Sequence, residues 1–290
     1  MGEYTLEQYD EAKSLYAKTA NYNEVARALR VPPSTIQLWL KTDAKPRRFS
    51  QKFRQNILIA SRVMAQRRTR QLPADAKTLT PIFGYILGAV KGDGCINGGY
   101  PYRNRVSKNY VIALSVIDYD FASAFWDALK RWSGMNVTMN EVVPRKKTWR
   151  NQWTVRLYSN KAGKYLKEYD ITKLQNAEEA VIAAFLRGFY DAEGGAYFNG
   201  KRVEVSVWNT DHALMKLVES LLYKVGIEKL YWCTDIRRQT PCYRISLNSR
   251  KEIRTFATKV GFSIKRKNNK LESIVNAPNM RGKWLRNTRK

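Results

Sequence analysis

The feature that most constrains this chain is a pair of matching apolar segments placed 100 residues apart. The first is PIFGYILGAVKGDG and the second lies within NAEEAVIAAFLRGFYDAEGG, and each ends in an acid followed by glycine. Small residues recur in the same register, as Gly84, Gly88 and Gly92 in the first segment and as Ala184, Gly188 and Ala192 in the second. Every fourth position lies on one face of a helix. The segments therefore predict two helices, each opening one copy of a repeated α+β unit.

Helix starts precede both segments. Thr80 and Pro81 are typical of a helix N-terminus, and Asn176 with Glu179 three residues later predicts a capped start for the second helix. Glycine inside a helix costs about 1 kcal/mol relative to alanine, so three in one helix indicate close approach to another backbone. We therefore expect the two helices to pack on each other.

The acids that end the two helices are Asp93 and Glu193. If the helices run side by side in the same direction, these carboxylates lie next to each other at negative helix ends. Such an arrangement is unfavourable without a cation between the carboxylates. Because the available ligands are oxygens, magnesium or another hard divalent ion is the expected occupant.

The composition indicates a polyanionic partner. The chain has 52 Lys and Arg against 25 Asp and Glu, a formal charge of +27, yet 44% of its 290 residues are apolar or aromatic. A folded protein with so positive a surface suits nucleic acid. The three scattered cysteines and the single His212 disfavour a disulfide scaffold, a zinc site and a histidine-based catalytic triad. We see no targeting segment and no run of eighteen apolar residues, and we expect a cytoplasmic protein without membrane contact.

Residues 4–42 predict three short helices, and the stretch NEVARALRVPPSTIQLWLKTD resembles a helix-turn-helix. In that arrangement Ser34, Thr35 and Gln37 would face a DNA groove. Arg30 stands where the turn usually has glycine, although Pro32 still enforces a break. The alternative is a small three-helix bundle that touches no DNA.

The predicted organisation has five parts. They are a helix-turn-helix-like domain at 1–44, a basic connecting helix within 45–79 closed by Pro73, a first repeat at 80–175, a second repeat at 176–262 and a basic C-terminal tail at 263–290. The tail is expected to add phosphate contacts or a terminal helix.

The two helix endings, ILGAVKGDG and LRGFYDAEG, resemble the signature helix of the LAGLIDADG homing endonucleases, present twice as in the single-chain members. The segments that follow each helix repeat the same order of strands and helices over about residues 80–262. The resemblance implies an α+β fold in which two antiparallel sheets form a DNA saddle around two packed helices. Here the fold would be preceded by a small all-α domain.

The resemblance also implies a metal-dependent endonuclease that makes a staggered double-strand break, as in intron homing. Asp93 and Glu193 would bind Mg²⁺, or another divalent cation such as Mn²⁺, helped by the backbone carbonyls of Gly92 and Ala192. Divalent ions can supply the nucleophilic water and the charge neutralisation that phosphodiester hydrolysis needs. The expected partner is double-stranded DNA with a long asymmetric site, bound by a monomer.

The family also places a polar residue on the strand after each signature helix. Asn209 in SVWN fits this place in the second repeat, whereas the first repeat has Val116, with Ser115 and Asp118 nearby. Because the first repeat lacks this polar residue, we expect less efficient cleavage of the first strand. A basic helper near the phosphate is expected as well, and Lys161 is the catalytic candidate, beside Arg202 and Arg250.

Basic and polar residues on or near the expected strands are candidates for the DNA-facing surface, by contact with bases or with phosphates. They are Arg103, Arg105, Lys108, Arg145, Lys147, Arg150 and Arg156 in the first repeat and Lys201, Arg202, Arg237, Arg238, Gln239 and Arg244 in the second.

Three other functions compete with cleavage. A transcription regulator with the same fold would use the helix-turn-helix and would not need both acids. An RNA maturase would bind structured intron RNA. A nonspecific architectural DNA binder would not need a duplicated acidic helix end.

Overall fold

The computed structural model describes residues 4–43, 51–98, 101–102, 105–106, 110–143, 150–198, 202–236 and 239–277. The chain forms two compact units, Met1–Met64 and Ala65–Lys290. The boundary falls within the segment that the sequence predicts as a connector. Among the described residues, no helix has the length and apolar character needed to cross a bilayer.

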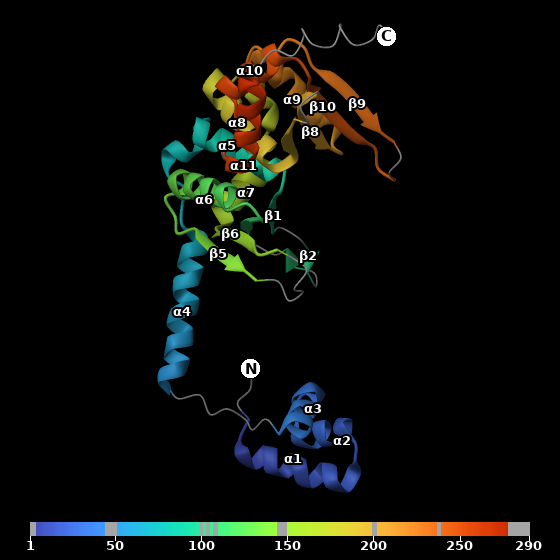
Figure 1. Ribbon diagram of the computed structural model, residues 1–290. Coiled ribbons are helices and arrows are strands. Elements are labelled where there is room, and N and C mark those ends of the chain that lie inside the picture. The colour runs from blue at the N-terminus through green and yellow to red at the C-terminus, as the bar shows by residue number, and fades with distance from the viewer. Residues whose placement is uncertain are drawn as a thin grey trace, which may run out of the picture. The chain divides into compact units, whose positions relative to one another are not determined.

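The N-terminal unit contains the three predicted helices, α1 (Leu6–Thr19), α2 (Tyr22–Leu29) and α3 (Pro33–Thr42) (Figure 1). Thr5 and Gln8 form a capping box at the start of α1. Arg30 adopts a left-handed conformation with φ of 53°, so it takes the backbone role that glycine usually fills in this turn. The unit has its own core, made of Tyr9, Ala12, Val25, Ala26, Val31, Ile36 and Trp39.

Helix α4 (Gln51–Thr69) leads from this unit into the second one. It ends four residues before Pro73, which precedes a short 3-10 helix, η1 (Ala74–Lys77). The predicted basic connecting helix is therefore present, although it ends before proline is reached.

Two parallel helices form the centre of the second unit, α5 (Pro81–Lys91) and α8 (Glu179–Glu193). Their glycines allow the backbones to touch, as predicted. A Cβ atom on Gly84 would lie 2.6 Å from the Val181 carbonyl oxygen, and one on Gly88 would collide with the carbonyl of Phe185. Side chains larger than hydrogen at these positions would force the helices apart.

The predicted start of α8 is wrong. Asn176 does not cap this helix, because Ile171–Asn176 form a 3-10 helix, η2, and Ala177 is extended. Glu178 is the residue at the N-cap, and its side chain makes no capping hydrogen bond. Helix α5 begins as predicted, with the Thr80 side chain accepting a hydrogen bond from the Phe83 amide.

Each repeat forms a four-stranded antiparallel sheet with the same topology. The first has the order β1 (Gly94–Asn97), β4 (Val111–Val116), β6 (Gln152–Tyr158) and β5 (Thr138–Val142). The second has the order β7 (Gly194–Phe198), β8 (Val203–Asn209), β10 (Cys242–Leu247) and β9 (Tyr231–Asp235). A separate two-stranded pair joins β2 (Pro101–Tyr102) and β3 (Arg105–Val106). The matching strand order confirms the predicted duplicated α+β fold.

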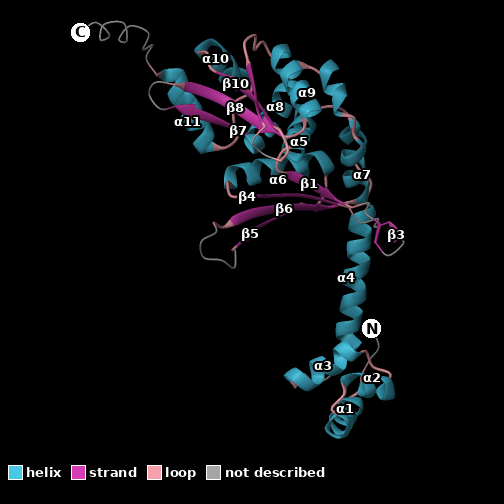
Figure 2. Cartoon of the chain, turned by 90° about the vertical axis from the view of Figure 1, so that its right-hand side faces the viewer, coloured by secondary structure: helices cyan, strands magenta, loops and turns pink. Residues whose placement is uncertain are grey.

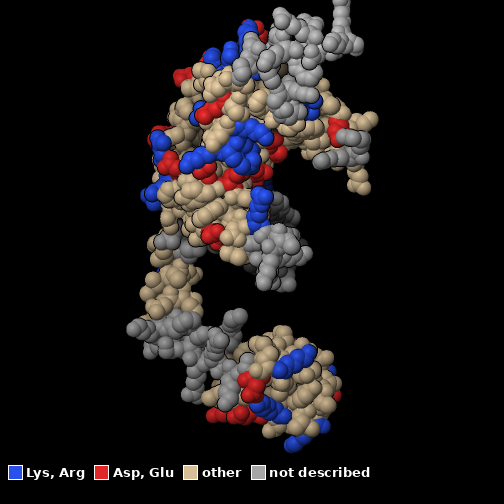
Figure 3. Space-filling model, viewed as in Figure 1, with Lys and Arg blue, Asp and Glu red and all other residues tan. Residues whose placement is uncertain are grey.

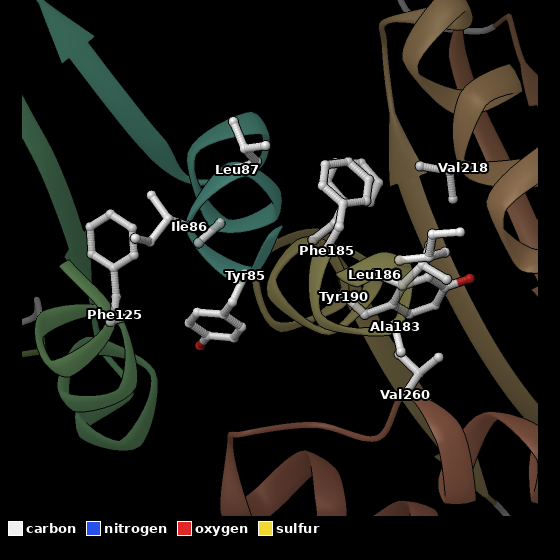
Figure 4. Close-up of a cluster of buried hydrophobic side chains, with 14 of the residues drawn as sticks. Tyr85, Ile86, Leu87, Phe125, Ala183, Phe185, Leu186, Tyr190, Val218 and Val260 are labelled. Atoms are coloured by element: carbon white, nitrogen blue, oxygen red, sulfur yellow. The ribbon is translucent and has the colours of Figure 1, made fainter. Parts of the chain in front are cut away.

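The two sheets lie on either side of the α5–α8 pair (Figure 2). Further helices pack around this centre, α6 (Tyr119–Ser133) and α7 (Asn160–Glu168) in the first repeat and α9 (His212–Lys224) and α10 (Arg250–Lys259) in the second. Ile86 of α5 points toward Phe125 of α6, while Leu186 of α8 points toward Val218 of α9 (Figure 4). These side chains belong to one continuous core, so the two repeats share a single hydrophobic interior.

Residues 265–276 of the predicted C-terminal tail form a helix, α11 (Lys265–Asn276). Leu271 and Ile274 are buried in the shared core, and α11 packs against β7 and α10. The helix is therefore part of the folded unit, although it carries several cationic side chains.

Candidate active site

The C-terminal ends of α5 and α8 bring Asp93 and Glu193 together. Glu193 is the last residue of α8, and Asp93 follows Gly92 at the end of α5. A Cβ atom on Gly92 would lie 3.2 Å from Cγ of Glu193, so the two helix ends are in contact. Both carboxylates therefore lie at the negative ends of two parallel helices, as the small-residue pattern predicted.

Burial and nearby negative charge raise the cost of ionising both carboxylates. Loss of hydration raises the pKa of Glu193, and the negative charge of Asp93 raises it further. Loss of hydration also raises the pKa of Asp93, although this residue is exposed, and the charge of Asp118 adds to the effect. The ammonium group of Lys267 acts on both carboxylates in the opposite direction. A positive charge between the carboxylates is therefore strongly favoured.

Asn209 holds one of these carboxylates. It is the last residue of β8, and its Nδ2 atom donates a hydrogen bond to Oε1 of Glu193 at 3.2 Å. Its Oδ1 atom accepts a hydrogen bond from the Asp211 amide at 2.9 Å. The corresponding last residue of β4 is Val116, so the first repeat has no amide at this place.

Lys267 is the basic residue beside the carboxylates, and the sequence patterns above did not single it out. It lies in the first turn of α11 and is 8% exposed. Its Nζ atom donates hydrogen bonds to the carbonyl oxygens of Tyr190 at 3.2 Å and Asp191 at 2.6 Å, at the end of α8. Burial lowers the pKa of Lys267 to about 8, although the charge of Asp191 opposes this shift. The sequence does contain a pattern that could have indicated burial of Lys267. Lys267, Leu271 and Ile274 have the spacing of one helix face, and the other two residues of this face are apolar.

A cleft of about 570 Å³ opens beside Asp93. Its lining includes Asp118, Arg150, Arg266 and Lys267. Arg266 makes a bidentate ion pair with Asp118, with both N–O distances at 2.7 Å, and this pair lowers the pKa of Asp118. Arg150 brings a predicted DNA-binding side chain to the same cleft. The cleft therefore combines carboxylates with several cationic groups, and the cationic groups suit an anionic phosphate.

Asp191 ties α8 to its neighbours through the hydrogen bonds of its side chain. It is 1% exposed and accepts hydrogen bonds from the Tyr85 hydroxyl at 3.1 Å and from the Ser263 amide at 2.9 Å and hydroxyl at 2.5 Å. Burial raises the pKa of Asp191, and the hydrogen bonds from Ser263 oppose this shift. Because Ser263 closely precedes α11, this network fixes the start of the helix that carries Lys267.

The structure does not bring Lys161 to the carboxylates. Lys161 is exposed in the first turn of α7, and the preceding residue bonds to the Tyr110 amide at one end of β4. Asp93 lies near the other end, because Gly94 pairs with Leu114. The other two basic candidates are engaged elsewhere: Arg202 pairs with Glu204 at 3.1 Å, and Arg250 donates to the Ala277 carbonyl. The contacts that decide these positions are long-range, and spacing in the sequence cannot reveal them.

Some predicted DNA-facing residues lie on the sheet faces that point away from the core. In β6, Val155 and Leu157 are buried, so Arg156 between them lies on the opposite face. Arg244 of β10 lies over the ring of Trp208 at 4.7 Å and pairs with the buried Glu204. Gln239 precedes β10 and is exposed.

The N-terminal candidates lie on α3, where Ser34 and Gln37 are exposed and Thr35 is partly exposed. Arg105 belongs to β3, and its side chain lies outside the described part. The remaining candidates lie outside the described residues, namely Arg103, Lys108, Arg145, Lys147, Lys201, Arg237 and Arg238.

A comparison with known protein families finds a match in the second repeat. Residues 180–261 match the family model of the LAGLIDADG-like domain. The chain therefore contains a LAGLIDADG-like domain in its second repeat, which confirms the LAGLIDADG resemblance predicted from the signature segments.

Two relatives come from Methanocaldococcus jannaschii. The uncharacterised protein MJ0398 is 26% identical over 288 residues, which cover 93% of each chain. The uncharacterised protein MJ0314 is 31% identical over 166 residues, which cover 55% of this chain and 60% of the relative. Among solved structures, one of the mesophilic variants from the homing endonuclease I-DmoI aligns with a TM-score of 0.48 and 21% identity, over 63% of this chain and 96% of that one.

Proposed function

We propose that this protein is a site-specific DNA endonuclease that hydrolyses phosphodiester bonds with a divalent metal and leaves a staggered double-strand break. The observation that carries the proposal is the meeting of Asp93 and Glu193 at the ends of two parallel helices, beside Lys267. Two carboxylates with raised pKa values, near a buried lysine, fit hydrolytic chemistry better than a purely structural role.

The donor set fits magnesium or manganese. Asp93 and Glu193 would hold the ion, and the carbonyls of Gly92 and Ala192 are further oxygen donors at helix ends. Mg²⁺ typically uses one or two protein carboxylates and completes its shell with water and substrate phosphate. Among the described residues, no group of three or more His, Cys, Asp or Glu side chains is placed to hold a metal ion. When bound, the ion supplies Lewis-acid activation and neutralises phosphate charge.

The chain's own residues have separate tasks. Asn209 orients Glu193 through its amide, and the Asp191–Ser263 hydrogen bonds hold the start of α11. Lys267 and Arg150 line the cleft, where each would offer a positive charge to the scissile phosphate. Because the pKa of Lys267 is lowered to about 8, this group can release or accept a proton near neutral pH.

The DNA would lie along the sheet faces that carry Arg156 and Arg244, held by the positive field of a chain with net charge +27. The two repeats present different side chains, so one protein molecule would recognise a long asymmetric site. The N-terminal helices α2 and α3 would extend the contact as a helix-turn-helix, with Ser34, Thr35 and Gln37 toward a groove.

The second candidate is a DNA-binding regulator without cleavage. A separate N-terminal unit with its own core favours it, since such a unit suits sequence recognition. This function leaves the proximity of Asp93 and Glu193 unexplained.

The test is incubation of the purified protein with a randomised duplex-DNA library, in magnesium or in chelator, followed by sequencing of the ends. The matched control is the double variant Asp93→Asn, Glu193→Gln. We expect magnesium-dependent breaks at one long motif, absent from the double variant.

Enrichment of bound DNA without breaks in magnesium or manganese would favour the regulator. If neither breaks nor enrichment occurred, binding to structured intron RNA would be measured next, as expected for a maturase.

A further inference from the structure

The outward face of the second sheet carries an arginine that is not an ordinary surface cation. In β10, Ile245 and Leu247 are buried in the core, so Arg244 lies on the opposite face of the sheet. Its guanidinium carbon lies 4.7 Å from the centroid of the Trp208 ring, and its side chain is only 20% exposed. A guanidinium packed on an indole ring in this way loses much of the rotamer freedom of an exposed arginine.

A buried carboxylate lies beside this guanidinium. The side chain of Glu204 in β8 is only 5% exposed, and it forms ion pairs with a terminal nitrogen of Arg244 and with Arg202 at 3.1 Å. A carboxylate buried to this extent needs cationic partners to stay charged. Burial lowers the pKa of Arg244, and the charge of Arg202 lowers it further. The ion pair with Glu204 therefore orients the guanidinium of Arg244 and offsets its charge.

Arg244 has more N–H donors than these neighbours accept from. Its Nε atom is buried and has no hydrogen-bond partner within the described part of the chain. An unpaired buried donor costs free energy, so a neutral side chain would be favoured here if Arg244 had no further use. The N–H groups on the terminal nitrogens that do not donate to Glu204 are left for a ligand on this face of the sheet.

The edge of a guanine base fits this arrangement better than a phosphate does. The terminal N–H groups of arginine match the O6 and N7 acceptors that guanine presents in the major groove, which admits β-strands. A phosphate would be repelled by the carboxylate of Glu204, whereas the uncharged guanine edge would not. Figure 3 shows Lys and Arg side chains gathered at the surface over α11, and exposed groups of that kind suit phosphate instead.

The equivalent position of the first repeat has different chemistry. Arg244 lies opposite Trp208, one residue before the end of β8. The same position in the first sheet pairs Thr154 with Ser115, one residue before the end of β4. These two hydroxyls form a hydrogen bond with each other at 3.1 Å. Because a hydroxyl can donate or accept, it distinguishes bases weakly.

We infer that Arg244 selects a guanine in the half of the DNA site bound by the second repeat, and that Glu204 is the residue that positions it. The symmetric base pair in the other half of the site is read weakly by the two hydroxyls. This inference rests on the DNA binding of the proposed function. Base selection makes and breaks no covalent bond, so it can be tested without cleavage.

The first experiment is selection of bound duplexes from the randomised library in chelator. We expect one position at which the parent protein enriches guanine about 10- to 100-fold over other bases, and at which Arg244→Lys removes the enrichment. Lysine keeps the positive charge but lacks the planar fork of arginine. The matched control is Arg202→Gln, because Arg202 also pairs with Glu204 but is 61% exposed. This control should weaken binding to all sequences alike and leave the guanine preference intact.

Glu204→Gln tests the positioning role. The change leaves Arg244 with its full charge but without the carboxylate that orients it. We therefore expect the guanine preference to fall, while binding to unrelated duplex DNA becomes tighter and more dependent on salt. Glu204→Asp should recover part of the preference. Circular dichroism and thermal melting establish that each variant is folded. A merely structural role of Glu204 would instead weaken binding to every duplex alike.

A cross-linking experiment locates the selected base on the protein. Cys233 is exposed and lies directly opposite Arg244 in the pairing of β9 with β10. A cytosine that pairs with the selected guanine and carries an activated disulfide tether should cross-link to Cys233, and Cys233→Ser should abolish this product. Cys95→Ser is the control, because Cys95 is exposed on β1 of the first repeat.

A guanine preference that survives Arg244→Lys, or a cross-link to Cys95 in place of Cys233, would overturn the inference. An equal loss of affinity for all sequences in Arg244→Lys would also overturn it, because Arg244 would then be a phosphate contact. Enrichment of DNA without cleavage in magnesium would remove the endonuclease activity and leave this inference standing. Failure of the parent protein to enrich any duplex would remove the proposed function, and the inference with it.

Discussion

The ammonium group of Lys267 donates a hydrogen bond to the carbonyl oxygen of Asp191 at 2.6 Å, two residues before Glu193. A cation at the C-terminus of a helix is favoured by the partial negative charge of the unpaired carbonyls. This bond therefore links α11 to the end of α8 and keeps a positive charge beside both carboxylates. Cleavage and the stability of the second unit should both depend on this arrangement.

Replacement of Asp93 by Asn should stop cleavage while leaving DNA affinity nearly intact. The side chain keeps its size but loses the charge that a divalent ion requires. We expect the cleavage rate to fall by at least about 100-fold, measured on the selected site, with binding followed in chelator by fluorescence anisotropy. A parallel loss of binding would mean that Asp93 has a structural role.

Replacement of Gly88 by Ala should destabilise the second unit by about 1–3 kcal/mol. The new methyl group would meet the backbone of Phe185 and Phe189 on α8, and a helix backbone cannot move aside locally. The higher helix propensity of alanine offsets only about 1 kcal/mol. Urea unfolding measures the change.

The control for this variant is Gly195→Ala in β7, where a Cβ atom would meet nothing within 4 Å. It should unfold at the urea concentration of the parent protein. Equal stability of the two variants would show that the helices tolerate separation.

Replacement of Asp191 by Ala should loosen α11. The change leaves the hydroxyl of Tyr85 and the amide and hydroxyl of Ser263 without their common acceptor, at a cost of about 1–3 kcal/mol. Limited proteolysis should then cleave within 265–276 sooner than in the parent protein. Asp191→Asn keeps one acceptor oxygen and should lie between the two. Unchanged proteolysis of Asp191→Ala would contradict the anchoring role.

Removal of residues 1–44 should weaken DNA binding and shorten the footprint without abolishing cleavage. The N-terminal helices have their own core, while both carboxylates belong to the second unit. Footprinting and cleavage of the selected site measure the two effects separately. Failure of the shortened protein to cleave under any condition, while still folded, would contradict this division of labour.

Replacement of Arg156 by Gln should lower the salt dependence of DNA binding. If Arg156 contacts a phosphate, the slope of log K against log salt falls by about 1. Arg131→Gln is the control, because Arg131 lies on α6 and pairs with Asp127 at 3.6 Å. If the parent protein, Arg156→Gln and Arg131→Gln all showed the same slope of log K against log salt, Arg156 would not contact the DNA backbone.

Local patterns in the sequence were enough to predict the central pair of packed helices, α5 and α8. The four-residue spacing of Gly84, Gly88 and Gly92, repeated 100 residues later, indicated two touching helices and the meeting of Asp93 with Glu193. Helical spacing and strand alternation are local properties, so they were sufficient to predict the order of elements and the duplicated α+β fold.

Only the tertiary structure decided which basic residue joins the carboxylates. Lys161 belongs to the same repeat as Asp93 but stands at the far end of β4, whereas Lys267 comes from a segment expected to be a tail. The start of α8 also depended on tertiary context, because Asn176 is the last residue of η2. The placement of Lys267 depends on contacts between residues more than 70 positions apart, such as Ser263 with Asp191. Contacts of this kind have no regular spacing in the sequence, so local patterns do not predict them.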